Sequence, residues 1–307
     1  MGSRRLIVSH SCLGLGDAVC LTAAFRSLRK DGVEVVLECG NPNIIRELLR
    51  DNPDCLSVGR IGEFAGGDRI DVEPYLWAYE REHKPAVDKS RPRLFMDALE
   101  VAGLARPRLV WSKTREYAIR EEFDKVSRGA PIIFLQTETA ETYKRPNDDV
   151  MQKIITRMLS QGYIVVTHTQ SMNHLNVWAL PHSVSEPVVS VPCWGIRSVV
   201  AGLSACDAGM GFDSFFLHAS AAMDLPFIAM LGPTHCSGRV VDYPYAIASE
   251  FPCDLCEAAC FRNSVIPCQK YDGEVALAQS SCLDQSGVEG LVQQVKVVLE
   301  WSSRWHR

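Results

Sequence analysis

The feature that most constrains this chain is a repeated alternation between short apolar runs and longer amphipathic stretches. The apolar run at 4–10 is followed by a glycine loop and by the segment 17–32, in which leucine and phenylalanine recur on one face of a predicted helix. Another apolar run, VEVVLE at 33–38, comes directly after it. This order of strand, helix and strand predicts a parallel sheet.

A second series of the same kind begins near residue 130. PIIFLQ at 131–136 predicts a strand, 147–162 predicts a helix, and YIVVTH at 163–168 predicts the next strand. The alternation continues through PFIAMLG at 226–232, and the segment 287–301 predicts a closing helix. The two series together favour an α/β chain with two doubly wound domains.

We place the predicted domain boundary near residue 128, with an N-terminal domain at 1–128 and a C-terminal domain at 129–307. Ligands of doubly wound sheets bind beyond the carboxyl ends of the strands. Two such domains are therefore expected to face each other across an interdomain cleft.

The composition disfavours several classes of partner. The formal net charge is −5 over 307 residues, which gives no general basic field for nucleic acid. No apolar stretch approaches the roughly 20 residues of a transmembrane helix, and the first apolar run is too short for a signal peptide. We expect a cytoplasmic protein with reduced thiols, and nothing in the sequence indicates its oligomeric state.

Four polar loops follow predicted strands and carry the candidate chemistry. They are Gly14 to Asp17, Thr137 to Arg145, Gly211 to His218, and Gly232 to His235. A glycine loop before a helix can bring backbone amides to an anion. The first loop lacks the third glycine of a dinucleotide fingerprint and the Lys-Ser/Thr of a P-loop, so neither of those sites is predicted.

Three of the four loops also have an ordinary structural explanation. Asp17 and Asp213 are equally consistent with acids at a helix start. Lys144 is equally consistent with a solvated surface lysine, and His218 with a core histidine. The position of all four loops at strand ends is the reason to expect one shared site.

Three segments carry a resemblance to a known family. They are LGLGDAVCLTAAFRSLRK at 13–30, QTETAETYKRPNDDV at 136–150, and LSACDAGMGFDSFFLHASAAMDLPFIAMLGPTH at 203–235. Together they resemble the ADP-heptose:lipopolysaccharide heptosyltransferases, glycosyltransferases with the two-domain GT-B fold. The last segment is the most specific, because it pairs Asp-Ser-x-x-x-His with Gly-Pro-Thr one strand later.

The resemblance implies an enzyme that transfers a sugar from a nucleotide-diphosphate donor, with inversion and without a catalytic metal, to a hydroxyl of lipopolysaccharide, another glycan or a protein. ADP-heptose is the favoured donor. Asp17 falls at the position of the general base, Lys144 at that of the phosphate-binding lysine, and Asp213 at that of the acid that contacts the donor sugar. The other donor-binding positions implied are Gly14, Gly16, Thr137, Ser214, His218, Gly232 and Thr234.

Two departures from the family pattern keep a second interpretation open. Phe215 stands where the family has glycine, and no acidic residue for the ribose follows the strand at 163–168. The alternative is a non-catalytic GT-B module that binds a sugar nucleotide or a partner protein.

The segment 253–282 contains five of the twelve cysteines of the chain, beginning with a C-x₂-C pair. Four thiolates suit a structural zinc or iron site, although unligated thiols or disulfides would also fit the spacing. The expected ligands are four of Cys253, Cys256, Cys260, Cys268 and Cys282. Some members of the resembled family carry such a segment, and a branch that modifies autotransporter adhesins holds iron there, so the resemblance also implies protein glycosylation as an alternative. The remaining seven cysteines are predicted to be small core residues: Cys12, Cys20, Cys39, Cys55, Cys193, Cys206 and Cys236.

Overall fold

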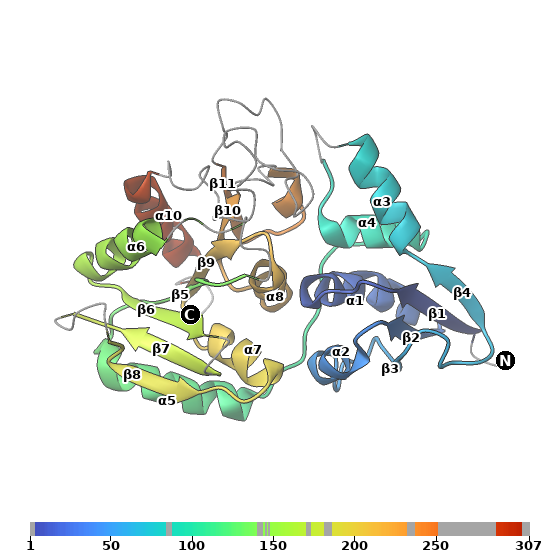
Figure 1. Cartoon of the computed structure of the whole chain (residues 1–307), viewed down its shortest axis with the longest axis horizontal. Coiled ribbons are helices and arrows are strands. Elements are labelled where there is room, and N and C mark those ends of the chain that lie inside the picture. Colours follow the sequence, from blue (N-terminus) through green and yellow to red (C-terminus); the bar gives the residue numbers. More distant parts are fainter. Residues whose placement is uncertain are drawn as a thin grey trace, which may run out of the picture.

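The computed structural model describes residues 4–83, 88–139, 144, 146, 148–169, 173–180, 186–231, 237–250 and 287–302. Within these residues the chain forms two α/β domains that lie side by side (Figure 1). Each domain is built on its own sheet, as the two series of alternating segments predict.

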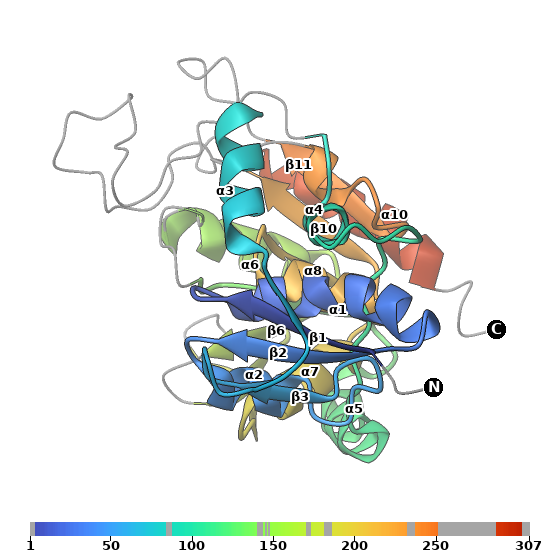
Figure 2. The same cartoon turned by 90° about the vertical axis from the view of Figure 1, so that its right-hand side faces the viewer.

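The first domain contains a four-stranded parallel sheet in the order β3-β2-β1-β4 among the described residues. Its strands are β1 (Arg4–His10), β2 (Val33–Cys39), β3 (Ser57–Gly59) and β4 (Asp68–Asp71). Its helices are α1 (Leu15–Lys30), α2 (Pro42–Leu48), α3 (Glu73–Glu82) and α4 (Arg91–Ala98). In Figure 2, which views the molecule from the side of this domain, α3 stands upright while β1 and β2 run across the picture.

The second domain contains a seven-stranded sheet in the order β11-β10-β9-β5-β6-β7-β8, again among the described residues. Its strands are β5 (Ile132–Leu135), β6 (Ile164–Thr169), β7 (His174–Trp178), β8 (Val189–Pro192), β9 (Ala208–Phe212), β10 (Phe227–Leu231) and β11 (Ala246–Glu250). Its helices are α5 (Lys113–Ser127), α6 (Asp148–Ser160), α7 (Ile196–Ser204), α8 (Phe215–Met223), the short 3₁₀ helix η3 (Ser237–Val240) and α10 (Val288–Ser302).

The second sheet differs from the prediction at one edge. β7 and β8 pair antiparallel to their neighbours, while the other strands are parallel. The chain between Thr169 and His174 is too short for the crossover that a parallel strand requires. The segment after YIVVTH therefore returns as a hairpin instead of starting a new strand-helix unit.

Helix α5 joins the second domain although it precedes the predicted boundary at residue 128. Arg120 of α5 donates to Asp207 at 2.8 Å and to the carbonyl oxygen of Ala205 at 3.1 Å. Arg115 donates to the carbonyl oxygen of Pro192 at 2.6 Å. The boundary at 128 stays a prediction, and these contacts support a first domain that ends before α5.

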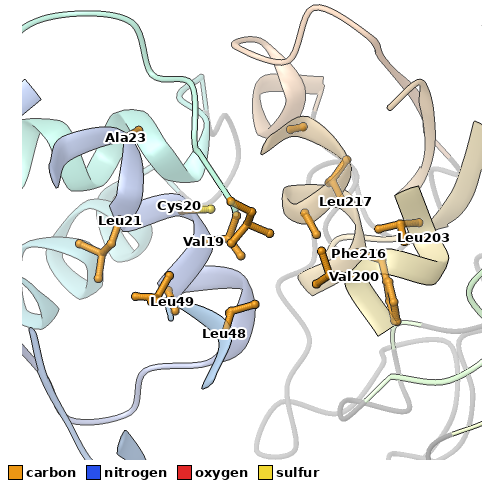
Figure 3. Close-up of a cluster of buried hydrophobic side chains, with 14 of the residues drawn as sticks. Val19, Cys20, Leu21, Ala23, Leu48, Leu49, Val200, Leu203, Phe216 and Leu217 are labelled. Atoms are coloured by element: carbon orange, nitrogen blue, oxygen red, sulfur yellow. The ribbon is translucent and has the colours of Figure 1, made fainter. Parts of the chain in front are cut away.

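The two domains meet through an apolar contact (Figure 3). One buried cluster runs from α1 and the end of α2 to α7 and α8 of the second domain. Val19 and Leu48 contribute from the first domain, and Val200, Phe216 and Leu217 from the second. A second cluster lies on the opposite face of the larger sheet, under α6 and α10. The domain interface is therefore a continuation of the core.

The cysteines outside the clustered segment follow the prediction in part. Cys20, Cys39, Cys193 and Cys206 are buried. Cys12 is exposed, so its prediction as a core residue is wrong: it lies in the loop between β1 and α1, beyond the last buried position of the strand. Cys55 is only partly buried, and Cys236 lies outside the described residues.

In the part of the chain that the structure describes, no helix combines the length and apolar character needed to cross a membrane.

Candidate active site

The site is built where the start of α1 approaches the start of α8 from the other domain. A side chain at Gly16 would place its Cβ 2.9 Å from Cδ2 of His218 and 3.4 Å from the backbone nitrogen of Phe215. Only glycine allows this approach without displacement of its neighbours. At Gly14, which precedes the helix, an added Cβ would meet nothing within 4 Å. The contact between the domains therefore requires glycine at the position of Gly16 but not at that of Gly14.

Asp17 lies in the first turn of α1, and its carboxylate is held by an arginine of α4. Arg91 donates from Nε to Oδ1 at 2.7 Å and from Nη2 to Oδ2 at 3.3 Å. Burial would raise the pKa of Asp17, but Arg91, together with His10 and His218, lowers it below its ordinary value. Asp17 is therefore ionised at neutral pH.

Arg91 also begins a chain of opposite charges that crosses between the domains. Its Nη1 donates to Oε1 of Glu80 at 2.6 Å. The same oxygen accepts from Nη2 of Arg239 at 3.4 Å, and Nε of Arg239 lies 3.9 Å from Oδ2 of Asp213. Glu80 belongs to the first domain and Arg239 to η3 of the second. The two carboxylates that the sequence singles out, Asp17 and Asp213, are linked by alternating charges.

Asp213 follows β9 and is surrounded by cationic and polar groups. Burial would raise its pKa, yet Arg239, Lys144 and His218 bring it down to about 2. Nζ of Lys144 donates to the backbone carbonyl oxygen of Asp213 at 3.2 Å. Lys144 therefore lies against the start of α8, and its phosphate-binding role stays a prediction.

His218 is a buried histidine on α8 with contacts to both domains. Its Nδ1 and the hydroxyl of Tyr243 share a hydrogen bond of 2.6 Å, and the same hydroxyl lies 3.7 Å from Sγ of Cys20 in α1. Nε2 of His218 lies 3.8 Å from Oδ1 of Asp213. Burial lowers the pKa of His218 to about 4 in spite of the nearby Asp213 and Asp17, so the imidazole is neutral at neutral pH.

The remaining predicted donor residues are less closely engaged with this network. Ser214 donates to Oε1 of Gln136 at 2.8 Å, and the same oxygen accepts from the backbone nitrogen of Phe212 at 3.1 Å. Thr137 is partly buried just after β5. Gly232 and Thr234 lie outside the described residues, as do Cys253, Cys256, Cys260, Cys268 and Cys282.

At the carboxyl ends of β1 and β4, a histidine and a glutamate form a further part of the site. His10 ends β1, and its ring lies near both Asp17 and Glu73, the first residue of α3. Glu73 accepts from Ser11 and from the indole nitrogen of Trp77. Adjacent parallel strands place these residues at one edge of the sheet.

The sequence did not identify several of these residues. Arg91, Glu80 and Glu73 lie in the charged segment at 59–92, for which the sequence predicted no helix, although Ser90 followed by Arg-Pro is a usable helix-start signal. Arg239 and Tyr243 had no local signal, because their importance comes from the docking of the two domains. The charge-rich composition of 59–92 was the available clue to the first group.

No family model matches the chain, and no curated protein sequence matches it. Solved structures do match in fold. ADP-heptose lipopolysaccharide heptosyltransferase II of E. coli has a TM-score of 0.66 at 14% identity, over 98% of this chain and 99% of that one. A family 9 glycosyltransferase of Veillonella parvula DSM 2008 has a TM-score of 0.64 at 14% identity, over 96% and 97%.

A third matching structure is the iron-containing dodecameric glycosyltransferase TibC of enterotoxigenic E. coli H10407. Its TM-score is 0.62 at 14% identity, and the match covers 99% of this chain and 77% of TibC. These likenesses show that the chain has the GT-B fold, and so confirm the fold that the resemblance implied.

Proposed function

We propose that this protein is a heptosyltransferase-like glycosyltransferase that moves a sugar, with inversion, from a nucleotide-diphosphate donor to an acceptor hydroxyl. The observation that carries this proposal is the contact between the starts of α1 and α8, which gathers Asp17 of one domain with Asp213, Lys144 and Arg239 around the other. The GT-B fold shared with the solved heptosyltransferases supports the same reaction class.

Asp17 is the proposed general base. It would take the proton of the acceptor hydroxyl as that oxygen attacks the anomeric carbon, which requires a distance of about 3 Å between the two oxygens. Its lowered pKa keeps it ionised and able to accept the proton. Arg91 holds both carboxylate oxygens in the present arrangement, so the acceptor hydroxyl must approach a carboxylate that is already oriented.

The leaving diphosphate is proposed to bind at the start of α8. Lys144 and Arg239 supply positive charge there, and the amides of a helix N-terminus favour an anion. Stabilising the charge that develops on a leaving group is worth on the order of 100-fold or more in rate. Asp213 would then contact the donor sugar, with Ser214 and His218 beside it.

ADP-heptose remains the favoured donor. One solved structure of TibC contains ADP-D-beta-D-heptose, and one of the E. coli heptosyltransferase WaaC contains ADP. The acceptor is a hydroxyl of lipopolysaccharide, another glycan or a protein. A cytoplasmic location stays a prediction from the sequence.

We further propose that four of the five clustered cysteines hold one structural zinc or iron ion, separate from the chemistry. The spacing of the thiols supports this, and TibC is described as containing iron. Elemental analysis of protein purified without chelator should find about one zinc or iron per chain. A chain free of both metals would exclude the site.

A non-catalytic module that binds a sugar nucleotide is the second candidate. Phe215 at the first position of α8 favours it, because an aromatic side chain stands where the resembled family has glycine. In that case calorimetry would detect binding of a nucleotide sugar that the protein neither transfers nor hydrolyses.

The deciding experiment is incubation of the protein with ADP-, UDP- and GDP-sugars, with mass spectrometry to detect transfer or hydrolysis. We expect turnover of one donor, and a loss of about 100-fold or more in kcat in Asp17→Asn. Glu122→Gln is a suitable control, because Glu122 is a partly exposed residue of α5, in the other domain from Asp17, and its carboxylate pairs with Lys125. Full activity of Asp17→Asn would remove Asp17 as the base.

A further inference from the structure

His10 is a buried polar residue that the proposed chemistry has not yet used. Its side chain is 5% exposed, and neither ring nitrogen has a hydrogen-bond partner among the described residues. A buried polar atom without a partner costs about 1–3 kcal/mol. Such a group in the candidate site calls for a functional explanation.

The ring lies between two carboxylates. Nε2 is 4.0 Å from Oδ2 of Asp17, and Nδ1 is 3.6 Å from Oε2 of Glu73. Oδ2 is also the Asp17 oxygen that Arg91 holds at the longer distance, 3.3 Å against 2.7 Å for Oδ1. The imidazole therefore faces the less tightly held oxygen of the proposed base.

Glu73 is fixed in position on the other side of the ring. Its Oε2 accepts from the backbone nitrogen of Ser11 at 3.0 Å and from the Ser11 hydroxyl, and its Oε1 accepts from Nε1 of Trp77 at 3.2 Å. The hydrogen bond from the Ser11 hydroxyl is the main reason that the pKa of Glu73 is lowered to about 2. Glu73 therefore stays an anion and can stabilise a cation beside it.

The charges around His10 decide its resting state. Burial lowers its pKa, Asp17 of α1, Glu73 of α3 and Asp71 at the end of β4 raise it, and Arg91 of α4 lowers it; the net pKa lies below the ordinary value. The imidazole is neutral at neutral pH, so it has one nitrogen able to accept a proton.

We propose that His10 receives the acceptor proton from Asp17 and holds it as an imidazolium ion beside Glu73 until the proton leaves for solvent. This inference rests on the proposed function. The acceptor oxygen forms its bond to the anomeric carbon, the bond from that carbon to the diphosphate oxygen breaks, and the leaving group keeps the electron pair. The acceptor proton passes to Oδ2 of Asp17 and then to Nε2 of His10, which restores the Asp17 carboxylate.

The pairing of Asp17 with Arg91 is the physical reason for this step. A carboxyl group whose pKa is lowered by an arginine is a strong acid once protonated, so it tends to give the proton to a nearby base. His10 has a ring nitrogen close to Asp17 and a carboxylate on its far side. Glu73 would thus act as a carboxylate that stabilises a neighbouring imidazolium ion and itself stays unprotonated. His10 and Glu73 are positioning residues, because they act on the substrate through Asp17.

The first test examines the resting protein and needs no substrate. Nitrogen-15 NMR of the full chain, with the His10 signal identified by its loss in His10→Gln, should show at pH 7 a neutral ring with the proton on Nδ1, facing Glu73. A neutral ring with the proton on Nε2, or a cationic ring at pH 7, would overturn the proposal. If His10→Gln does not fold, His10→Asn serves to identify the same signal.

The second test uses the donor found for the wild-type protein and follows kcat, KM and their pH dependence. His10→Gln should lower kcat about 10- to 100-fold with little change in the KM for the donor. The acid limb of kcat/KM should move to lower pH, because His10 no longer has to be neutral. Glu73→Gln should lower kcat in the same direction, and the double variant should be no slower than His10→Gln, since both residues serve one step.

A matched control separates this role from a structural one. His83→Gln removes a histidine at the end of α3 whose ring stacks on Tyr79, and it should leave kcat and the pH profile unchanged. A His10→Gln variant with kcat within twofold of wild type and an unmoved acid limb would overturn the relay alone. Absence of transfer and hydrolysis by the wild-type protein with every donor would overturn the proposed function, and the relay with it.

Discussion

The pairing of Asp17 with Arg91 controls the charge of the proposed base. In Arg91→Gln the cation is lost while burial remains, so the pKa of Asp17 should rise above that in the wild-type protein. Carbon-13 NMR titration of the labelled Asp17 carboxyl group measures this shift without any substrate. An unchanged titration would show that Arg91 does not set the charge of Asp17.

Arg93→Gln is the control for that titration. Arg93 lies two residues further along α4, and its guanidinium contacts Asp242 at 3.5 Å and the carbonyl oxygen of Gly103 at 3.1 Å. Its loss should leave the titration of Asp17 where it is in the wild-type protein. The comparison separates the direct effect of Arg91 from a general loss of positive charge.

His218 predicts a loss of stability on acidification. Its pKa is about 4 in the folded chain and 6.5 ordinarily, so between these values the unfolded chain binds more protons and the free energy of unfolding falls as pH falls. The loss is complete below pH 4 and amounts to about 3 kcal/mol. Urea titrations at pH 7.5, 6, 5 and 4 should show it, and His218→Gln should make the dependence shallower in that window.

The individual residues show how far a sequence can predict a site. Asp17, Lys144 and Asp213 could be proposed as site residues because each sits in a local motif at a strand end. Arg91 and Arg239 could not, since an arginine becomes important here only when folding brings it to a carboxylate from a distant segment. Charge pairing between segments that are distant in the sequence leaves no periodic trace in the chain.

At the scale of the elements, the contact of α1 with α8 depends on one glycine. Gly16→Ala would force its methyl group against His218 and the backbone of Phe215, and overpacking of this kind costs typically 1–3 kcal/mol. The free energy of unfolding from urea titration should fall by about that amount. Gly14→Ala, whose added methyl meets nothing and whose φ is −83°, should cost less than Gly16→Ala. Equal losses in the two variants would show that the helices do not approach so closely.

The elements also show which parts of the fold were predictable. The alternation of apolar and amphipathic segments predicted α1, β2, β5, α6 and β6, because each has a clear period. The hairpin of β7 and β8 was missed, since the strand-like alternation of β7 covers only the five residues HLNVW and β8 has only four residues, VSVP. The contacts of α5 with the second domain could not be predicted either, because they are hydrogen bonds from Arg115 and Arg120 that no local pattern reveals.

At the scale of the whole molecule, the apolar cluster between the domains predicts cooperative unfolding. Leu217 of α8 is fully buried in this cluster, and Leu→Ala at such a position costs about 2–5 kcal/mol. Leu217→Ala should destabilise both domains together, so that tryptophan fluorescence and far-UV circular dichroism give one coincident transition in urea.

Leu104→Ala is the matched control for this variant. Leu104 is 81% exposed, and a surface substitution of this kind changes the free energy of unfolding by at most about 0.5 kcal/mol. Two separate transitions in the wild-type protein would show instead that each domain unfolds on its own.

The apolar contact between α1, α2, α7 and α8 would also limit how the substrates of the proposed reaction enter and leave. Moving the two domains directly apart would expose side chains such as Val19, Phe216 and Leu217 to water. This exposure costs about 25 cal/mol of free energy for each Å² of apolar surface. A rotation that keeps these side chains in contact, and parts only the charged residues beside them, avoids most of that cost. The apolar contact would then be the axis of the rotation, and the contact of Arg239 with Glu80 between the domains would have to break and form again in each cycle of the proposed reaction.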